Sequence, residues 1–193
     1  MIYDQTYFET VNGFHHPAGY SGYSRRPFVN LDDPDDQGEV QRTDYWKFKN
    51  KHNISGKVLD LGCAYGFFVE DLRSWGIEAY GIDGSEWAIS KANEYCTLQN
   101  VMEYLPTLAD NSFDVITGIR FLPCLTDAEI AEILPHILRI APKRLFVVDD
   151  RYSYMSPEQA NFAGTFYNVK PLGDWEALLE GCSVESIGYW GSQ

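Results

Sequence analysis

Paired cysteines, long apolar runs and an excess of basic residues are all missing from this 193-residue chain. Its four cysteines are scattered, without a Cys-x-x-Cys pair or a Cys/His spacing that would hold zinc, so a reducing compartment fits best. No apolar segment approaches the length of a membrane span, and the acidic, aromatic residues 1–9 do not resemble a signal peptide. We therefore expect a cytoplasmic protein that is not embedded in a membrane.

Positive charge is scarce, because 15 Lys and Arg residues stand against 28 Asp and Glu residues and give a formal net charge of -13. A field of this sign repels a phosphate backbone, so nucleic acid is not an expected partner. The length suits one domain with its own core, and there is no internal repeat. We expect this domain over residues 40–193, after an aromatic-rich leader over residues 1–39. The sequence does not indicate an oligomeric state.

From Lys57 onward, short β-branched runs alternate with segments of helical periodicity, which is typical of a parallel sheet covered by helices. The expected fold is doubly wound α/β, with a mostly parallel sheet of six or seven strands. Strands are expected at residues 57–61, 78–82, 101–104, 113–119, 144–148 and 183–189. Helices are expected at residues 40–49, 67–75, 86–95, 127–138 and 174–179, the third and fourth capped by Ser85 and Thr126. A closing antiparallel strand is not evident, unless residues 166–169 supply an edge, and Pro135 should kink or divide the fourth helix.

One segment joins the first expected strand to the first helix of the sheet region through a tight turn of small residues. Residues 58–68 read VLDLGCAYGFF, a pattern that lets backbone approach a nucleotide-like ligand. An NAD fingerprint would need a third glycine where Phe67 stands, and a P-loop would need a lysine and a hydroxyl residue after Gly66. A dinucleotide and a nucleoside triphosphate are therefore both disfavoured.

Two acids stand at the ends of the first two strands of this region. Asp60 would repel a pyrophosphate but suits the cationic ammonium of a methionine moiety, directly or through water. Asp83 follows Gly62 by 21 positions, the place where a carboxylate takes up ribose hydroxyls in nucleotide-binding βαβ units. Together they predict a ligand with a ribose, a positive charge and no phosphates.

These segments resemble the first and second motifs of class I S-adenosylmethionine-dependent methyltransferases, in the group that acts on small molecules. The resemblance spans residues 57–189, and residues 105–106 and 111–114 are similar to the third and fourth motifs. It implies a Rossmann-like methyltransferase fold, S-adenosylmethionine as cofactor with S-adenosylhomocysteine as product, and methyl transfer to an oxygen or nitrogen of a small-molecule acceptor. It also implies cofactor contacts, with Asn100 at adenine N6, from Asp60, Gly62, Cys63, Ala64, Tyr65, Gly66, Phe67, Phe68, Asp83, Gly84, Asn100, Val101 and Ile119.

The chain departs from the family pattern after the fourth strand. Many relatives carry Glu-His-Leu there, whereas this chain has Pro123-Cys124-Leu125, and Cys124 is expected as a buried small hydrophobe. The signature of exocyclic base N-methylation, an acidic or amide residue followed by two prolines and an aromatic, is absent from residues 118–121. Methylation of a base is therefore not expected.

The leader resembles the lid that folds over the cofactor in part of this family. The matching residues are a Tyr-Phe pair at Tyr7 and a Gly-Tyr-x-x-Tyr segment containing Tyr20 and Tyr23, which are implied to contact the cofactor. Ordinary packing of these aromatics on the domain surface is the alternative. If the lid closes, His15 and His16 are candidate general bases, since an imidazole titrates near neutral pH. Exposed loop histidines are an equal alternative.

Three alternatives stay open beside this interpretation. Asp149 and Asp150 follow the fifth strand and suit a divalent metal, as in catechol-type methyltransferases, although we favour loop acids and expect no metal. Trp87 either flanks the adenine or packs in the core. The function itself has two alternatives, a related enzyme that cleaves or rearranges S-adenosylmethionine and a non-catalytic module that binds it.

Overall fold

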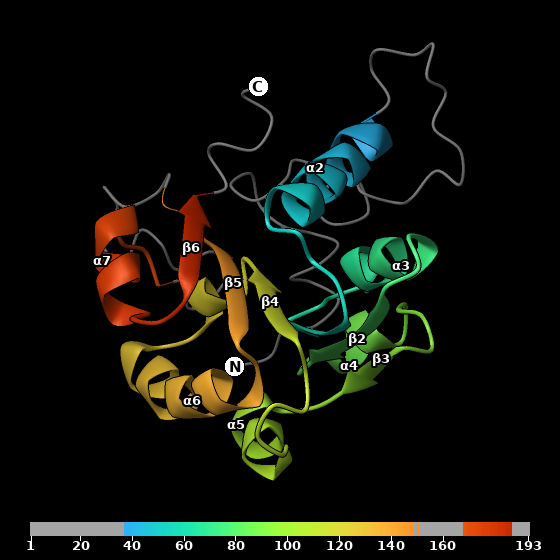
Figure 1. The fold of residues 1–193 in the computed structure, drawn as a ribbon. Coiled ribbons are helices and arrows are strands. Elements are labelled where there is room, and N and C mark those ends of the chain that lie inside the picture. Colours follow the sequence, from blue (N-terminus) through green and yellow to red (C-terminus); the bar gives the residue numbers. More distant parts are fainter. Residues whose placement is uncertain (1–36, 149, 151–167, 187–193) are drawn as a thin grey trace.

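The computed structural model describes the chain over residues 37–148, 150 and 168–186. Six strands form one sheet in the order β3-β2-β1-β4-β5-β6, and every neighbouring pair in it is parallel. Their bounds are β1 (Lys57–Leu61), β2 (Glu78–Asp83), β3 (Cys96–Leu98), β4 (Val115–Ile119), β5 (Lys143–Val148) and β6 (Ser183–Ser186). The expected doubly wound α/β fold is confirmed (Figure 1).

Helices cover both faces of this sheet (Figure 1). One face packs against α2 (Gln37–Lys51), α3 (Phe67–Ser74) and α4 (Glu86–Ile89). The other packs against α5 (Val101–Tyr104), η2 (Leu105–Thr107), η3 (Leu122–Cys124), α6 (Asp127–Ile140) and α7 (Leu172–Leu178). In the described part of the chain, no helix has both the length and the apolar character to cross a bilayer.

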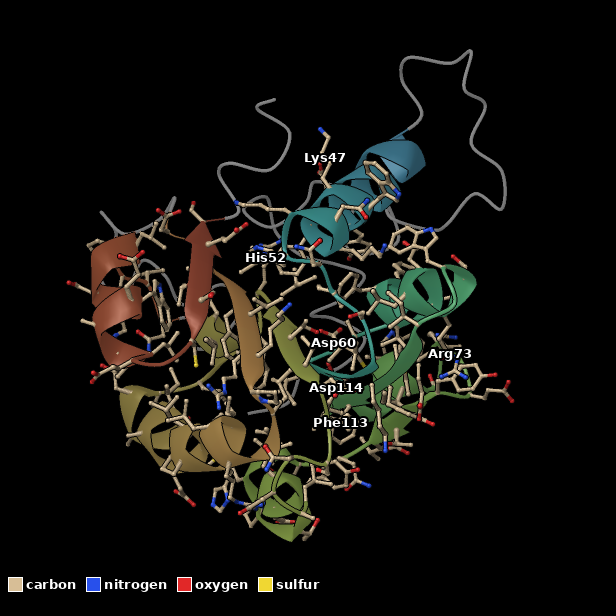
Figure 2. All side chains as sticks on the ribbon, in the orientation of Figure 1. Lys47, His52, Asp60, Arg73, Phe113 and Asp114 are labelled. Carbon is tan, nitrogen blue, oxygen red and sulfur yellow. The ribbon has the colours of Figure 1, made fainter. Side chains whose placement is uncertain are left out.

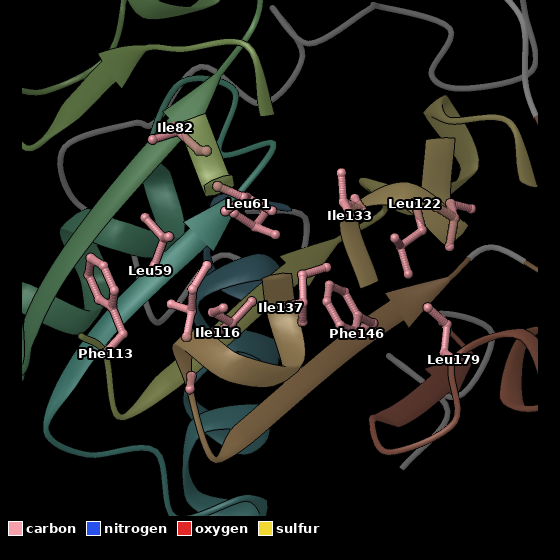
Figure 3. Packing of buried hydrophobic residues seen from close by; sticks show 14 of the residues in the cluster. Leu59, Leu61, Ile82, Phe113, Ile116, Leu122, Ile133, Ile137, Phe146 and Leu179 are labelled. Atoms are coloured by element: carbon pink, nitrogen blue, oxygen red, sulfur yellow. The ribbon is translucent and has the colours of Figure 1, made fainter. Parts of the chain in front are cut away.

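Alternating side chains along the strands build a core on each face. On β1, Leu59 and Leu61 join the cluster under α6 and α7, whereas Val58 joins the cluster under α2 and α3. Figure 3 shows the first cluster, in which Phe146 of β5 lies among the isoleucines of α6. Asp60 lies between Leu59 and Leu61, whose side chains point to the α6/α7 face. Because side chains alternate along a strand, Asp60 belongs to the α2/α3 face.

The third strand was expected at residues 101–104, and this prediction is wrong. Those residues form α5, because the Asn100 side chain accepts a hydrogen bond from the Met102 N–H at 2.9 Å and so begins a helix. The strand β3 lies earlier, at Cys96–Leu98. The helix capped by Ser85 ends at Ile89 instead of residue 95, and the Asn93 side chain accepts from the Tyr95 N–H at 3.0 Å in the turn before β3.

The capping box of α6 is confirmed. Thr126 accepts from the Glu129 N–H at 3.2 Å, and the Glu129 carboxylate accepts from the Thr126 N–H at 2.7 Å. Pro135 does not divide the helix, which is one element from Asp127 to Ile140. Among the described residues there is no antiparallel closing strand, Val169 is not in a strand, and residues 166–167 and 187–189 lie outside them.

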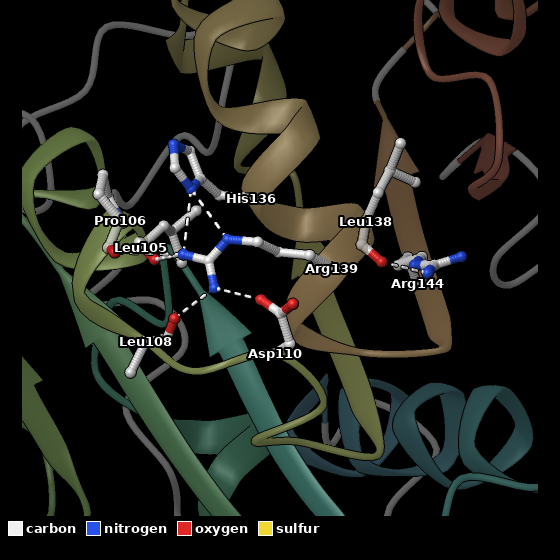
Figure 4. Close-up of polar contacts among 8 residues, drawn as sticks. All are labelled: Leu105, Pro106, Leu108, Asp110, His136, Leu138, Arg139 and Arg144. Carbon is white, nitrogen blue, oxygen red and sulfur yellow. Dashed lines mark hydrogen bonds and ion pairs between the residues drawn. The ribbon is translucent and has the colours of Figure 1, made fainter.

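Arg139 of α6 fastens the connection that leads from α5 to β4 (Figure 4). Its guanidinium donates to the carbonyl oxygens of Leu105 at 3.0 Å and of Leu108, and it pairs with Asp110 at 3.0 Å. The His136 ring accepts from the same guanidinium at 3.3 Å. These bonds serve the fold, since they satisfy carbonyl oxygens beyond the short helices that follow β3.

Candidate cofactor site

The glycine-rich segment leaves β1 at the carboxyl edge of the sheet and turns into α3. Gly62 and Gly66 have φ angles of 67° and 72°, in the left-handed region that favours glycine. The N–H groups of Gly62 and Cys63 donate to the Ile82 carbonyl oxygen at 2.9 and 3.0 Å. A Cβ atom at Gly66 would lie 2.5 Å from the sulfur of Cys96. The loop is therefore tightly turned and pressed against β2 and β3.

Asp83 ends β2 with its carboxylate directed at this loop. One oxygen accepts a hydrogen bond from the Ala64 N–H at 2.9 Å, and the other accepts from the Ser85 N–H at 2.8 Å. Burial raises the pKa of Asp83, while the bonds from Ser85 and Ala64 act to lower it. The carboxylate thus joins the loop after β1 to the N-cap of α4. Each oxygen has a second lone pair with which to accept from a ligand hydroxyl.

Asp60 lies deeper, near the end of β1 and at the middle of the sheet (Figure 2). Its side chain is 3% exposed, and its Oδ1 accepts from the hydroxyl of Thr117 on β4 at 2.7 Å. The pKa of Asp60 is raised to about 7, mainly by burial and to a smaller extent by the charge of Asp83, while the hydrogen bond from Thr117 acts to lower it. Since burying an uncompensated carboxylate is costly, this site favours a cation brought by a ligand.

Aromatic side chains lie beside the loop on the side of α4. Tyr65 and Trp87 pack against Ala64 and Ala88, and the Lys91 ammonium lies 4.5 Å from the centre of the Trp87 ring. In the described part of the chain, the Trp87 indole N–H is buried without a hydrogen-bond partner. Trp87 therefore packs against the loop itself, and its contact with an adenine stays a prediction.

Other residues that the sequence assigns to the cofactor fall into three environments. Phe68 is buried against Tyr45 of α2, with ring centres 4.9 Å apart, so it packs in the core. Gly84 is exposed, and a Cβ added there would meet nothing nearer than 3.9 Å. Asn100 is exposed and caps α5. Half-buried positions on different elements are held by Tyr65, Phe67, Val101 and Ile119. These cofactor contacts stay predictions.

The predicted lid and bases fall outside the described residues. These are Tyr7, His15, His16, Tyr20 and Tyr23. Asp149, one of the two acids after β5, also lies outside them. Asp150 is described, and its carboxylate accepts a hydrogen bond from the buried Ser186 hydroxyl of β6. Within the described ranges, no group of three or more His, Cys, Asp and Glu side chains could hold a metal ion.

Sequence reasoning missed three residues at this edge. Thr117 is fully buried and donates to Asp60, and the signal for it was a hydroxyl residue inside an otherwise apolar strand. Arg120, directly after β4, has a φ angle of 60°, which few residues other than glycine adopt. Phe121 follows it and lies against Gly62. Nothing in the sequence marks either of these backbone and packing features. Cys124 is half-buried rather than buried.

Comparison with known proteins finds a matching family model and several solved structures of similar fold. Residues 58–143 match a family model described as a methyltransferase domain. No curated protein sequence matches the chain significantly. A SAM-dependent methyltransferase from Archaeoglobus fulgidus is similar in structure, with 21% identity and a TM-score of 0.57 over 74% of this chain and 66% of that one, just under two thirds.

Two further solved structures share the fold. The PH0226 protein from Pyrococcus horikoshii OT3 has 18% identity and a TM-score of 0.63, over 87% of this chain and 89% of that one. A methyltransferase from Clostridium acetobutylicum described as S-adenosylmethionine-dependent has 13% identity and a TM-score of 0.54, over 76% and 80%. The matched segment begins in β1 and ends at the start of β5, so it contains the loop and both acids. Over residues 58–143, this chain matches the methyltransferase domain family, and it shares the fold of these solved structures.

Proposed function

We propose that the protein transfers a methyl group from S-adenosylmethionine to an oxygen or nitrogen of a small molecule. The observation that carries the placement of the cofactor is the Asp83 carboxylate, which binds the loop at Ala64 and the N-cap at Ser85. This position, at the end of β2 and beside the glycine turn, is where ribose hydroxyls are recognised in nucleotide-binding βαβ units.

The residues present suit this cofactor chemically. Asp83 offers acceptor oxygens to the two ribose hydroxyls, which are donors. Asp60, with a pKa raised to about 7 by burial, gains from a neighbouring positive charge, which the methionine ammonium provides. In the described part of the site, no lysine or arginine donates to either carboxylate, and a pyrophosphate would face two acids. The donor set thus favours a cationic nucleoside over a dinucleotide.

When bound, S-adenosylmethionine supplies a methyl group on a positively charged sulfur, which needs no further activation. The protein's task is then to hold the reactants in line, and such positioning lowers a barrier by as much as about 7–11 kcal/mol. Asp83 fixes the adenosine end, and the tightly turned loop lets backbone approach the methionine end. Asp60 stabilises the positive charge near that end.

The acceptor lies in this proposal over the other half of the carboxyl edge, where β4, β5 and β6 end. Arg120 follows β4 there, and Asp150 and Ser186 face each other across β5 and β6. The absence of the base-methylation signature from residues 118–121 and the net charge of -13 both favour a small molecule over nucleic acid. His15 and His16 remain the proposed general bases.

The test is transfer of isotope-labelled methyl from S-adenosylmethionine to a panel of small phenols, alcohols and amines. Labelled product that forms together with S-adenosylhomocysteine supports the proposal. Methylthioadenosine and homoserine lactone, formed without any acceptor, would show a cofactor-cleaving enzyme instead. Tight binding without either product across the panel would indicate a non-catalytic module. On an identified acceptor, unchanged turnover of His15→Ala and His16→Ala would remove these residues from the mechanism.

A further inference from the structure

The chain makes an unusual turn directly after β4. Arg120 has a φ angle of 60°, and its N–H donates to the Val147 carbonyl oxygen of β5 at 2.7 Å. Left-handed backbone at a residue other than glycine is kept where the surrounding structure holds it, often next to a functional site. Here it turns the chain back across the carboxyl edge. The next residue, Phe121, is the N-cap of the short helix η3.

This turn brings the Phe121 ring against glycines of two neighbouring strands. A Cβ added to Gly62, just beyond β1, would lie 2.6 Å from ring atom Cδ2 and 2.9 Å from the Cβ of Phe121. A Cβ added to Gly118 of β4 would lie 3.4 Å from ring atom Cδ1. The Phe121 ring thus fills the space of a side chain at Gly62, whereas at Gly118 the nearest atoms belong to Phe146, at 2.8 and 2.9 Å.

The chain around Gly62 makes contacts on both faces of the sheet. On the α2/α3 face, Asp60 is bonded to Thr117, two residues before Gly62 and one before Gly118. On the α6/α7 face, Phe121 packs against the same two glycines as part of the core cluster. The middle of the loop is fixed by the bond from Ala64 to Asp83, and the N–H groups of Gly62 and Cys63 donate to the Ile82 carbonyl oxygen. Strand β2 therefore holds the backbone of the loop, and the Phe121 ring packs against its first glycine.

We infer that Phe121 is a positioning residue for the methionine end of the cofactor. Its ring packs against Gly62 and so restricts where the backbone of this glycine lies at the carboxyl edge of the sheet. The inference rests on the cofactor placement proposed above. Asp83 then governs the adenosine end, and Phe121 governs the amino-acid end without touching the cofactor. Catalytic sites tolerate little displacement, and a shift of about 1 Å can cost a hundredfold.

The first test compares two ligands that differ in the amino-acid part, S-adenosylhomocysteine and 5′-methylthioadenosine, by isothermal titration. Phe121→Leu is expected to weaken S-adenosylhomocysteine about tenfold and methylthioadenosine less than about threefold. Phe146→Leu is the matched control, because Phe146 lies in the same cluster and against Gly118 but is not among the nearest neighbours of Gly62. It should lower the melting temperature and leave the ratio of the two affinities unchanged.

The second test uses the steric complementarity of the pair. Gly62→Ala introduces both the contact with the Phe121 ring and a strained φ angle, and should weaken S-adenosylhomocysteine at least about tenfold. Adding Phe121→Gly removes both the ring and the Cβ atom that would lie 2.9 Å from the new methyl group, so the double variant should bind more tightly than Gly62→Ala. A thermal melt of each variant establishes that it is folded.

Two results would overturn the inference. One is an equal loss of both ligands in Phe121→Leu, which would make Phe121 a general packing residue like Phe146. The other is a double variant that binds no better than Gly62→Ala. Failure of the cofactor placement would look different, because Asp83→Ala would then bind both ligands as the wild type does.

Discussion

Asp60 lies near the end of β1 and Asp83 ends the neighbouring strand β2, yet the two carboxylates have different hydrogen-bond partners. Burial raises the pKa of Asp83, and the two backbone hydrogen bonds that its carboxylate accepts act to lower it. Asp60 is more deeply buried and accepts from the Thr117 hydroxyl, and its pKa rises to about 7. Asp83 therefore offers acceptor oxygens that backbone N–H groups hold in place, whereas Asp60 is a more deeply buried carboxylate that a cationic ligand would stabilise.

The largest expected effect is on cofactor binding by Asp83→Ala. This variant loses both proposed ribose contacts and the bond that holds Ala64, and hydrogen bonds to a charged group contribute about 1.5–3 kcal/mol each. The affinity for S-adenosylhomocysteine, measured by titration calorimetry, should fall at least about a hundredfold. An affinity within threefold of the wild type would show that Asp83 only fastens the loop.

Asp60→Asn should separate stability from binding. The folded pKa of about 7 lies above the ordinary 3.8, so the ionised carboxylate destabilises the fold increasingly from about pH 4 to pH 7. Asparagine keeps an acceptor for Thr117 but carries no charge, so the variant should be about 2–4 kcal/mol more stable than the wild type at pH 8. Denaturant unfolding at pH 5 and pH 8 measures this. Lower stability of the variant at pH 8 would contradict it.

The same substitution tests for a proton released on binding. A cation beside Asp60 favours its ionised form, so at pH 7 the wild type should release part of a proton when S-adenosylmethionine binds. Affinity should then rise between pH 6 and pH 8, by at most about tenfold per pH unit. Calorimetry in buffers of different ionisation enthalpy detects the proton. Asp60→Asn should show neither effect, and a proton released by that variant would place the titrating group elsewhere.

The smallest expected effect on the site comes from Thr126→Ala, which serves as the distant control. It removes the capping box of α6 and should cost about 0.5–2 kcal/mol of stability. Thr126 contacts neither Asp60 nor Asp83. Cofactor affinity should therefore stay within about twofold when stability and titration are measured together. A larger loss of affinity would show that general destabilisation also lowers binding, and would weaken the comparison between Asp60 and Asp83.

Much of this arrangement could be predicted from the residues. The strand, turn and helix around Gly62 and the acid at Asp83 follow from β-branched runs, small residues and spacing, which are local signals. The capping box at Thr126 was equally local. Each of these patterns lies within a few neighbouring residues and favours one backbone conformation, so the sequence alone predicts it.

The wrong strand prediction and the missed contacts also have physical causes. Val101 begins an apolar run that suits a strand, but the Asn100 cap started a helix, and β3 formed around Cys96 instead. The bond between Thr117 and Asp60 joins residues 57 positions apart, so only the register of β1 against β4 reveals it. Gly62 could be marked as a turn, but its partner Phe121 could not, because that contact depends on the left-handed Arg120.

The sheet order places β1 and β4 side by side at its centre, with later strands added outward on each side. The connection after β1 leads toward β2 and β3, and the connection after β4 leads toward β5 and β6. The loops at the carboxyl ends of β1–β3 therefore lie apart from those at the carboxyl ends of β4–β6. In the proposed function, the half with the glycine turn binds the nucleoside of the cofactor, and the half that ends in Arg120, Asp150 and Ser186 binds the acceptor. Substitutions in the second half would then change what is methylated and leave the cofactor contacts in place.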